Sequence, residues 1–397
     1  MRTLRNLPSQ PRRDAWLEVN LGAIEYNARA IRKLIPAYVN LMAIVKADAY
    51  GHGAAMILPT LEASGVSMAG VASIDEAIQL RQAGLKLPIL VIGVAPDWAF
   101  QFAADYGIQL TIFAQHHLES LRKAYQQDQI PFQVHIKVDT GMHRIGIPWE
   151  KAAEFIRRCQ SLPYLDVKGI FSHLADSHDP ELSALQMERW REVCAQVKPL
   201  PPYVHISNSG HALTPQVFSE KDLRNQSLEN ERQNLLTLAR LGIAFFGYEE
   251  NAKPAGLNLK PVMSLKARIM HLQTVPPGTG ISYGHTWHAS GDEARVIATL
   301  PIGYADGVFR CLSNRIEGLL SGQRVPQVGN ITMDQMMFDV SAVPDVAIGD
   351  TVTLLGEDGL GDKKNSIWLD DWAKKADTIE YELMCALRVR LPKTYTR

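Results

Sequence analysis

The chain has 397 residues, more than a typical single domain and enough for two. Its formal net charge of -1 argues against nucleic acid as a partner, because such proteins carry a basic surface. Hydrophobic residues make up 46% of the chain, yet the most apolar window, 87–94, is too short for a membrane span, and the four scattered cysteines fit neither a disulfide framework nor a zinc site.

The chain begins with a basic segment that lacks the apolar stretch of a secretory signal, so we expect a short tail on a cytoplasmic protein with no bound metal. A strand-like run at 15–20 follows and is expected to pair with a second domain. From 41 to about 247, short apolar runs alternate with amphipathic stretches. The expected strands are 41–46, 67–72, 88–93, 109–113, 132–138, 167–173, 203–207 and 235–240.

Helical periodicity separates these runs, for example at 74–84, 150–160 and 184–197. Continuous apolar strands alternating with helices indicate parallel strands that are covered on both faces. The series predicts an α/β fold, a closed (β/α)8 barrel of the TIM type over 21–257. An open dinucleotide-binding sheet is disfavoured, because no Gly-x-Gly-x-x-Gly follows the first strand.

After about residue 257 the β-rich runs are separated by Gly, Pro and Asp turns. We therefore predict a mostly β C-terminal domain over 258–397 with one late helix at 366–376, and we assign 1–20 as a tail plus the strand that pairs with it. Within the barrel region, 219–235 is polar and highly charged and is expected to be a surface insertion.

Polar side chains follow several predicted barrel strands, at the face where such barrels carry their active sites. Lys46 closes the first strand, and its burial would lower its pKa and make its amine nucleophilic. The commoner state of a lysine at a rim is contact with solvent. The other polar residues at strand ends are Arg144, His173, Asn208, Ser209 and Arg240.

Each of these residues also has an ordinary structural interpretation. Arg144 is suited to hold a carboxylate or to form a rim salt bridge. The turn at Asn208 and Ser209 is suited to hold an anion or to cap a helix. A single histidine such as His173 is more often structural than catalytic. Tyr283 lies between glycines in a turn, either presented to a ligand or simply exposed.

Eight stretches together resemble the alanine racemase family over nearly the whole chain. They are WLEVNLGAIEYN, AIVKADAYGHG, KVDTGMHRIGI, SNSG, RLGIAFFGY, ISYGHTW, LPIGYADG and GNITMDQMMFDV. The stretch AIVKADAYGHG and the paired GYADG and MDQ motifs are the most specific. The resemblance implies a pyridoxal 5'-phosphate-dependent enzyme that interconverts L-alanine and D-alanine, with D-alanine going to peptidoglycan.

The resemblance also implies a head-to-tail homodimer with composite active sites. Lys46 would hold the cofactor and act on one face of the substrate, and Tyr283 from the second subunit would act on the other. Arg240 would face the ring nitrogen with His173 behind it, and Arg144 would lie near the substrate carboxylate. The remaining implied residues are Tyr50, Asn208, Ser209, Gly242 and Ile243 around the phosphate, Met333, which would reach the substrate from the second subunit, Asp334 nearby, and Lys137, which matches a lysine that can be carbamylated.

Three departures from the family pattern stand out. The segment 219–235 lengthens one connection, Val389 stands where many members carry a tyrosine that touches the phosphate, and Thr332 stands where a cysteine is frequent. Three alternatives remain open at this point. They are a racemase of serine or of a broad range of amino acids, a barrel-type amino-acid decarboxylase, which usually places a carboxylate at the ring nitrogen, and a non-catalytic cofactor carrier.

Overall fold

A computed structural model describes residues 13–214, 236–249, 257–387 and 390–397. The expected insertion at 219–235 and the position Val389 lie outside the described residues. The chain divides into a barrel unit, 23–49 with 53–260, and a C-terminal unit, 1–22 with 50–52 and 261–397.

The barrel unit contains the predicted parallel strands, hydrogen-bonded in the order β10-β2-β3-β4-β5-β6-β8-β9. Thr237, just before β10, links the two end strands of this order, β10 and β9. Its N–H donates to Val204 O at 2.9 Å, and its carbonyl accepts from Asn40 N at 2.9 Å. The prediction of a (β/α)8 barrel is confirmed, with the ring nearly closed. The strands are β2 (Asn40–Ile44), β3 (Met68–Val71), β4 (Ile89–Val94), β5 (Ile108–Ile112), β6 (Phe132–Asp139), β8 (Leu165–Phe171), β9 (Tyr203–His205) and β10 (Leu238–Leu241), with β7 (Ile147–Pro148) beside β6.

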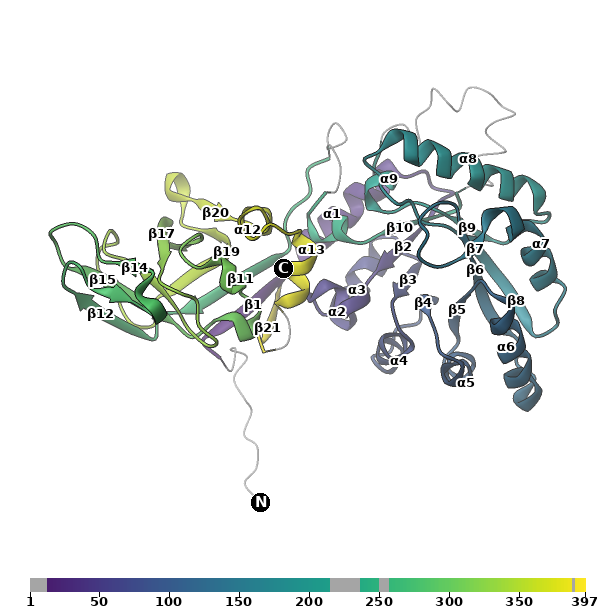
Figure 1. The fold of residues 1–397 in the computed structure, drawn as a ribbon, viewed down its shortest axis with the longest axis horizontal. Helices are drawn as coiled ribbons and strands as arrows, with labels where there is room; N and C mark the ends of the chain where they lie inside the picture. Colours follow the sequence, from purple (N-terminus) through teal and green to yellow (C-terminus); the bar gives the residue numbers. More distant parts are fainter. Residues whose placement is uncertain (1–12, 215–235, 250–256, 388–389) are drawn as a thin grey trace, which may run out of the picture. The chain divides into compact units, whose positions relative to one another are not determined.

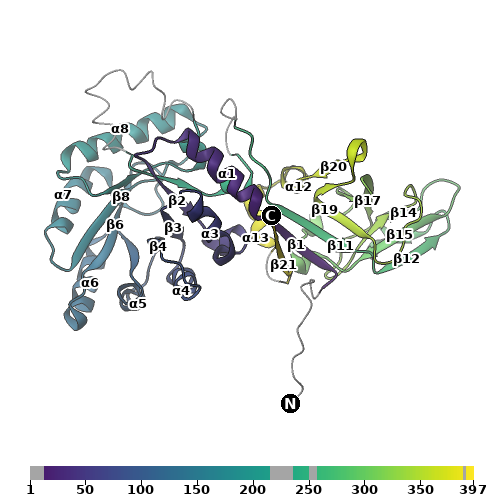
Figure 2. The ribbon, with the colours of Figure 1, turned by 180° about the vertical axis from the view of Figure 1, so that it is seen from behind.

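Helices surround these strands, which explains why the strands are apolar on both faces. Every residue of β3 and β5 is buried. The outer helices are visible from both sides in Figures 1 and 2. They are α1 (Leu21–Leu34), α3 (Ala54–Ala63), α4 (Ile74–Gln82), α5 (Phe100–Asp105), α6 (Gln115–Asp128), α7 (Trp149–Gln160) and α8 (Pro180–Gln196).

The C-terminal unit is built on one sheet in the order β12-β15-β18-β17-β16-β19-β11-β1-β21, with β20 beside β19. The N-terminal strand β1 (Ala15–Asn20) pairs antiparallel with β11 (Met263–Arg268) and parallel with β21 (Lys393–Thr396). The prediction of a mostly β C-terminal domain is therefore confirmed. The remaining strands are β12 (His271–Val275), β15 (Arg295–Leu300), β16 (Glu317–Leu320), β17 (Gln323–Val328), β18 (Met336–Asp339), β19 (Thr351–Asp358) and β20 (Asn365–Ile367).

The end of the chain carries two helices where the sequence predicts one. These are α12 (Leu369–Ala376) and α13 (Glu380–Ala386). The second helix has 7 residues, which is too short to show a repeated apolar pattern in the sequence. Its N-cap, Ile379, makes no side-chain hydrogen bond, so a capping signal is missing as well.

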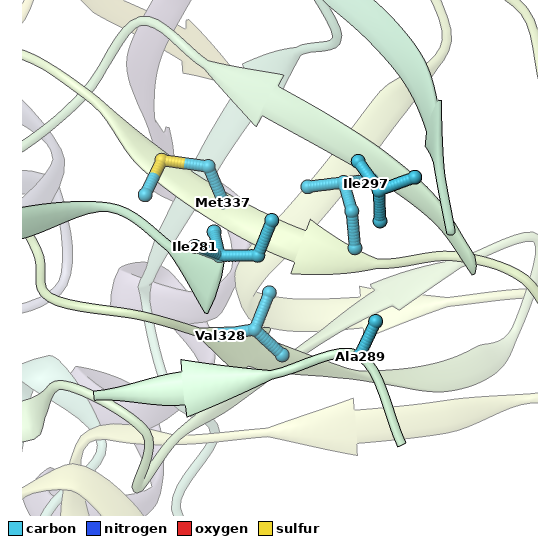
Figure 3. Packing of buried hydrophobic residues seen from close by; sticks show 6 residues of the cluster. Ile281, Ala289, Ile297, Val328 and Met337 are labelled. Atoms are coloured by element: carbon cyan, nitrogen blue, oxygen red, sulfur yellow. The ribbon is translucent and has the colours of Figure 1, made fainter. Parts of the chain in front are cut away.

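A hydrophobic cluster in the C-terminal unit holds a small hairpin against the sheet. The hairpin consists of β13 (Gly280–Ile281) and β14 (Trp287–His288), and Tyr283 lies between its two strands. Figure 3 shows the packing of this cluster. Its buried members are Val275, Ile281, Ala289, Ile297, Val328 and Met337, with Trp287 packed against them.

Candidate active site

Positively charged side chains gather at the carboxyl ends of the barrel strands. Lys46 follows β2, Lys137 lies on β6, Arg144 lies in the loop after β6, and Arg240 lies on β10. Burial, followed by the positive charges of Arg240, Lys137, Arg144 and Lys46, lowers the pKa of His173 to about 2. All four charges therefore lie near enough to His173 to lower its pKa, which brings together the polar residues predicted at the ends of separate strands.

Arg240 lies at the centre of this group and is buried. Its Nη1 donates to His205 Nδ1 at 2.8 Å. Its Nη2 donates to His173 Nδ1 at 3.0 Å and to the carbonyl oxygens of Ser172 and Ile206, each at 2.9 Å. Burial lowers the pKa of Arg240 to about 9. Within the described residues, its Nε–H has no acceptor and no carboxylate contacts the guanidinium.

A chain of hydrogen bonds continues from Arg240 across the inside of the barrel. His205 Nε2 lies 2.9 Å from His135 Nδ1, and His135 Nε2 lies 2.8 Å from Gln109 Oε1. Gln109 Nε2 then donates to Gln133 Oε1 at 3.2 Å. Because a guanidinium can only donate, each imidazole accepts on Nδ1 and donates from Nε2. The direction of the whole chain is thus set by Arg240.

Both imidazoles in this chain are neutral, since burial and then the charge of Arg240 lower the pKa of His135 to about 3 and hold that of His205 well below its usual range. Sequence reasoning did not single out these two residues. The available signal was one histidine inside each of two otherwise apolar strand runs, FQVHIKV and YVHIS.

Lys137 is buried beside this chain without an acidic partner. Its Nζ lies 4.5 Å from the centroid of the Phe171 ring. Burial, followed by the charges of Arg240 and Arg144, holds its pKa well below the usual range, while Asp139 acts in the opposite direction. The charged form of this lysine is therefore disfavoured at this place in the barrel.

The structure has Lys46 in the commoner of the two states considered for it, contact with solvent. β2 ends at Ile44, and Lys46 is exposed. It begins a left-handed turn in which Ala47, Asp48 and Ala49 have φ of 54°, 55° and 55°. The backbone, and not desolvation, therefore distinguishes this lysine.

The segments around Asn208 and Gly242 adjoin each other. Asn208 Oδ1 accepts from His211 N at 2.9 Å, so this residue caps the short helix α9 (Ser209–Ala212), which is the structural alternative foreseen for it. Ser209 Oγ accepts from Gly242 N at 3.0 Å, which leaves its hydroxyl proton available to a ligand. Ile243 follows as a buried residue, and Ser207 Oγ is buried with no partner among the described residues.

Arg144 is exposed and has no ion pair within the described part of the chain, so the rim salt bridge considered for it is not found. Its loop is organised by Asp139, whose Oδ1 accepts from the N–H groups of Gly141, Met142 and His143 at 2.9, 3.0 and 3.1 Å. The guanidinium is thus held on an ordered loop and remains available to an anion.

The C-terminal unit presents Tyr283 and Met333 to solvent, with exposed fractions of 75% and 52%. Asn330 Nδ2 donates to the Tyr283 carbonyl at 2.7 Å, and Ser282 Oγ donates to Asn330 O at 2.7 Å. Asp334 forms an ion pair with Arg390 at 2.8 Å. A defined loop therefore displays an aromatic side chain that its own unit does not bury.

Tyr50 is grouped with this C-terminal unit and not with the barrel unit. Its ring is buried and meets the Tyr381 ring edge-on, with centroids 5.6 Å apart. Tyr395 donates from its hydroxyl to His52 O at 3.1 Å. The contact with Tyr381 is thus aromatic, and the expected role of Tyr50 at a phosphate stays a prediction.

A parallel barrel with Lys46, Arg144 and Arg240 at or just beyond its strand ends defines an α/β-barrel enzyme suited to an anionic ligand at that face. A separate β unit with a displayed tyrosine completes the architecture. No helix in the described part of the chain is both long and apolar enough to cross a membrane. Among those same residues, no group of three or more His, Cys, Asp or Glu side chains is placed to hold a metal ion.

Comparisons with known proteins narrow this class. The N-terminal domain model of alanine racemase matches residues 19–250, and the C-terminal domain model matches residues 262–395. The chain therefore belongs to the alanine racemase family. An alanine racemase from Nostoc sp. is 41% identical over 391 residues, which cover 96% of this chain and 95% of the relative.

Solved structures agree with this assignment. An alanine racemase from E. faecalis is similar with a TM-score of 0.85 at 33% identity, covering 96% of this chain and 98% of that one. A histidine racemase from Leuconostoc mesenteroides is also similar, with a TM-score of 0.85 at 27% identity and coverage of 98% and 99%. The fold is thus shared by racemases named for different amino acids.

Proposed function

We propose that this chain is a pyridoxal-phosphate-dependent racemase that interconverts L-alanine and D-alanine, with D-alanine going to peptidoglycan. The observation that carries the proposal is the surroundings of Arg240, a buried cation with a free Nε–H and no carboxylate contact among the described residues. The alternative decarboxylase usually has a carboxylate at that place. The guanidinium favours the racemase.

The side chains at the barrel strand ends suit pyridoxal phosphate, an aldehyde with an anionic phosphate and a ring nitrogen that can accept a hydrogen bond. When bound, this cofactor stabilises the carbanion at the substrate Cα by delocalising its charge into the ring. Lys46 would hold it through the side-chain amine, and Arg240 would donate from Nε to the ring nitrogen. The residues proposed around the phosphate are Tyr50, Asn208, Ser209, Gly242 and Ile243.

Racemisation removes the α-proton from one face of the substrate and returns a proton to the other, so two proton carriers are needed. We assign one face to Lys46 at the barrel strand ends. We assign the other face to Tyr283 from a second subunit of a homodimer, because this exposed tyrosine is not used by the core of its own unit. Met333 and Asp334 are proposed at the edge of the same composite site.

Three further side chains are proposed to orient the substrate and Arg240. Arg144, with no ion pair in the described chain, is suited to bind the substrate carboxylate through two N–H groups. His173, which accepts from Arg240 at 3.0 Å, is proposed to steady the guanidinium from behind. The lowered pKa of Lys137 favours the neutral amine that takes up CO2, and the resulting carbamate would place a negative charge near Arg144 and Arg240.

The test is conversion of L-alanine to D-alanine by the purified protein with added pyridoxal phosphate. L-serine, L-lysine and L-histidine are assayed in parallel, the last because a histidine racemase shares this fold. Conversion of alanine at a kcat/KM far above the others is the expected result. Cofactor binding with release of CO2 and no racemisation would favour the decarboxylase, and cofactor binding with no turnover would favour the carrier.

A further inference from the structure

The turn that follows Lys46 has an unfavourable backbone. Ala47, Asp48 and Ala49 all adopt left-handed dihedral angles, with φ of 54° to 55° and ψ of 46° to 51°. A residue with a Cβ adopts this conformation rarely, and consecutive ones are rarer because each Cβ approaches the following carbonyl oxygen. Such a segment persists only where its surroundings hold it. Something other than glycine must therefore fix the turn at Lys46.

The carboxylate of Glu76, on α4, supplies that restraint. Glu76 Oε1 accepts from Ala47 N at 2.6 Å, and Oε2 accepts from Ala72 N at 2.7 Å. Ala47 comes directly after Lys46, and Ala72 comes directly after β3. One side chain thus ties the lysine turn to the end of the neighbouring strand through two charge-assisted hydrogen bonds, which are stronger than neutral ones.

The hydrogen bonds of the Glu76 carboxylate differ from those of a capping box at the start of α4 (Ile74–Gln82). Ser73 caps α4, and its side chain accepts from Glu76 N at 3.3 Å, as in the capping box S-x-x-E. In a full capping box the glutamate returns to the N–H of the capping residue. Here the two carboxylate oxygens of Glu76 serve Ala47 and Ala72 instead. The side chain is therefore committed to the lysine turn.

Other hydrogen bonds also act on this turn. Ala49 N donates to the Val45 carbonyl at 2.8 Å, Asp48 Oδ1 accepts from Ala54 N at 2.8 Å, and the Asp48 carbonyl accepts from Gly53 N at 2.9 Å, which connects the turn to the start of α3. A small cavity lies beside the turn, lined among others by Val45, Val71 and Glu76. The Glu76 carboxylate therefore acts together with these bonds, and it restrains the residue next to Lys46 from a different element, α4.

We propose that Glu76 is a positioning residue for Lys46, which it keeps in place by holding the following turn in its left-handed conformation. This inference rests on the proposed function, because only there is Lys46 the residue that holds the cofactor and moves a proton. Without the carboxylate the turn relaxes toward ordinary dihedral angles and redirects the Cα–Cβ bond of Lys46. A displacement of about 1 Å at a reacting group can cost about a hundredfold in rate.

The test compares the wild-type protein with Glu76→Ala, Glu76→Gln and a matched control, Asp75→Asn. Asp75 is exposed in the first turn of the same helix, so its substitution removes a charge without touching the lysine turn. The first measurement is hydrogen exchange at the Ala47 amide in the protein without cofactor. We expect protection in the wild type and in Asp75→Asn, its loss in Glu76→Ala, and partial loss in Glu76→Gln, which keeps one acceptor oxygen.

The second measurement separates kcat from KM in the protein loaded with pyridoxal phosphate. We expect kcat of Glu76→Ala to fall about 10- to 100-fold, with KM for alanine within about twofold, because substrate binding by Arg144 is untouched. A merely structural role would instead raise exchange across the whole barrel and leave kcat per folded molecule unchanged. If Glu76→Ala does not fold, Glu76→Gln carries both measurements.

The outcomes distinguish this inference from the proposed function. Borohydride reduction followed by peptide mass spectrometry locates pyridoxal phosphate on the wild-type chain. Its absence from Lys46 would overturn the proposed function, while the exchange at Ala47 would still decide whether Glu76 holds the turn. Cofactor on Lys46 in the wild type, with either an unchanged Ala47 amide or an unchanged kcat in Glu76→Ala, would overturn the positioning role.

Discussion

Four acceptors bind the guanidinium of Arg240, and all are neutral: His205 Nδ1, His173 Nδ1 and the carbonyl oxygens of Ser172 and Ile206. A cation facing the cofactor ring nitrogen leaves that nitrogen unprotonated, because two adjacent positive charges repel. The ring is then a weaker electron sink, which limits side reactions.

Arg240→Glu should therefore change the reaction as well as its rate. A carboxylate would favour the protonated ring, so we expect a long-wavelength absorption band during turnover, keto-acid products of transamination, and a kcat lower by about a hundredfold or more. Stopped-flow absorbance and a keto-acid assay measure these effects. Arg240→Lys, which keeps a positive charge, serves as the control and should show neither the band nor the keto acid. An unchanged spectrum in Arg240→Glu would contradict this role.

Lys137 is expected to carry a carbamate. Burial and the neighbouring arginines lower its pKa, which favours the neutral amine, the form that attacks CO2 to form a C–N bond with release of one proton to solvent. Nuclear magnetic resonance of the protein in 13C-bicarbonate should show a carbamate signal that disappears in Lys137→Ala. The exposed Lys151 on α7 provides the control, since Lys151→Ala should keep the signal. A signal that survives in Lys137→Ala would contradict the assignment.

At the scale of elements, β6, β8 and β9 build the polar interior of the barrel together. His135 on β6 lies next to Gly169 on β8, where a Cβ would stand 2.4 Å from His135 Nδ1. His205 on β9 then receives the hydrogen bond from Arg240. A glycine in the middle strand thus makes room for an imidazole from its neighbour, and the three strands orient Arg240 jointly.

Because His135 is buried as a neutral imidazole, we expect the protein to lose stability in acid. The unfolded chain protonates histidine near pH 6.5, whereas the folded chain keeps His135 neutral down to about pH 3. Between these values the unfolded state binds more protons, so the free energy of unfolding falls as the pH falls, by up to about 1.4 kcal/mol per pH unit for this residue.

His135→Gln should flatten that dependence. Glutamine can accept from His205 and donate to Gln109 but does not titrate, so we expect a cost of about 1–3 kcal/mol at pH 7.5 and a smaller slope between pH 6 and 4. Urea unfolding at a series of pH values measures both. The exposed His271, changed to Gln, should leave the slope unchanged. An identical slope in His135→Gln would show that this imidazole does not couple folding to protons.

The barrel strands were predictable because each is a continuous apolar run, and their order followed from the alternation with helices. Boundaries moved by one to three residues: β10 begins at Leu238 and not at 235, and β8 covers Leu165–Phe171, so His173 lies beyond its end. The strand β21 was missed, since KTYT is half-buried and alternates weakly. The left-handed turn after Lys46 could not be predicted, because local propensity opposes it and a distant carboxylate, Glu76, holds it.

Across the whole molecule, position in the sequence identified the candidate site residues at the ends of barrel strands. Residues that act on these from other elements, such as Glu76, His135 and Gln109, were not singled out. A histidine inside an apolar strand run was the one local signal for His135, and the contacts of all three residues exist only in the folded barrel. The assignments of Tyr50, Tyr283 and Met333 came from the resemblance to the family. Those three assignments stay predictions until the subunits are tested together.

The proposed composite active site makes a prediction that only a dimer can satisfy. Lys46→Ala and Tyr283→Phe should each be inactive alone, because each removes one of the two proton carriers from every site. Mixed under conditions that exchange subunits, they form heterodimers in which one site carries both substitutions and the other carries neither. Random pairing makes about half of the dimers mixed, with one intact site of two, so about a quarter of the wild-type activity should return.

The control for this experiment mixes Lys46→Ala with the double variant Lys46→Ala/Tyr283→Phe, in which no pairing restores a site. That mixture should stay inactive at every ratio, and sedimentation should show the same dimer in all samples. No recovery in the first mixture, despite demonstrated subunit exchange, would place Lys46 and Tyr283 in the same subunit's site or remove Tyr283 from the reaction. Recovery near a quarter would place the exposed loop of one subunit, held by Asn330 at the Tyr283 carbonyl, over the barrel strand ends of the other.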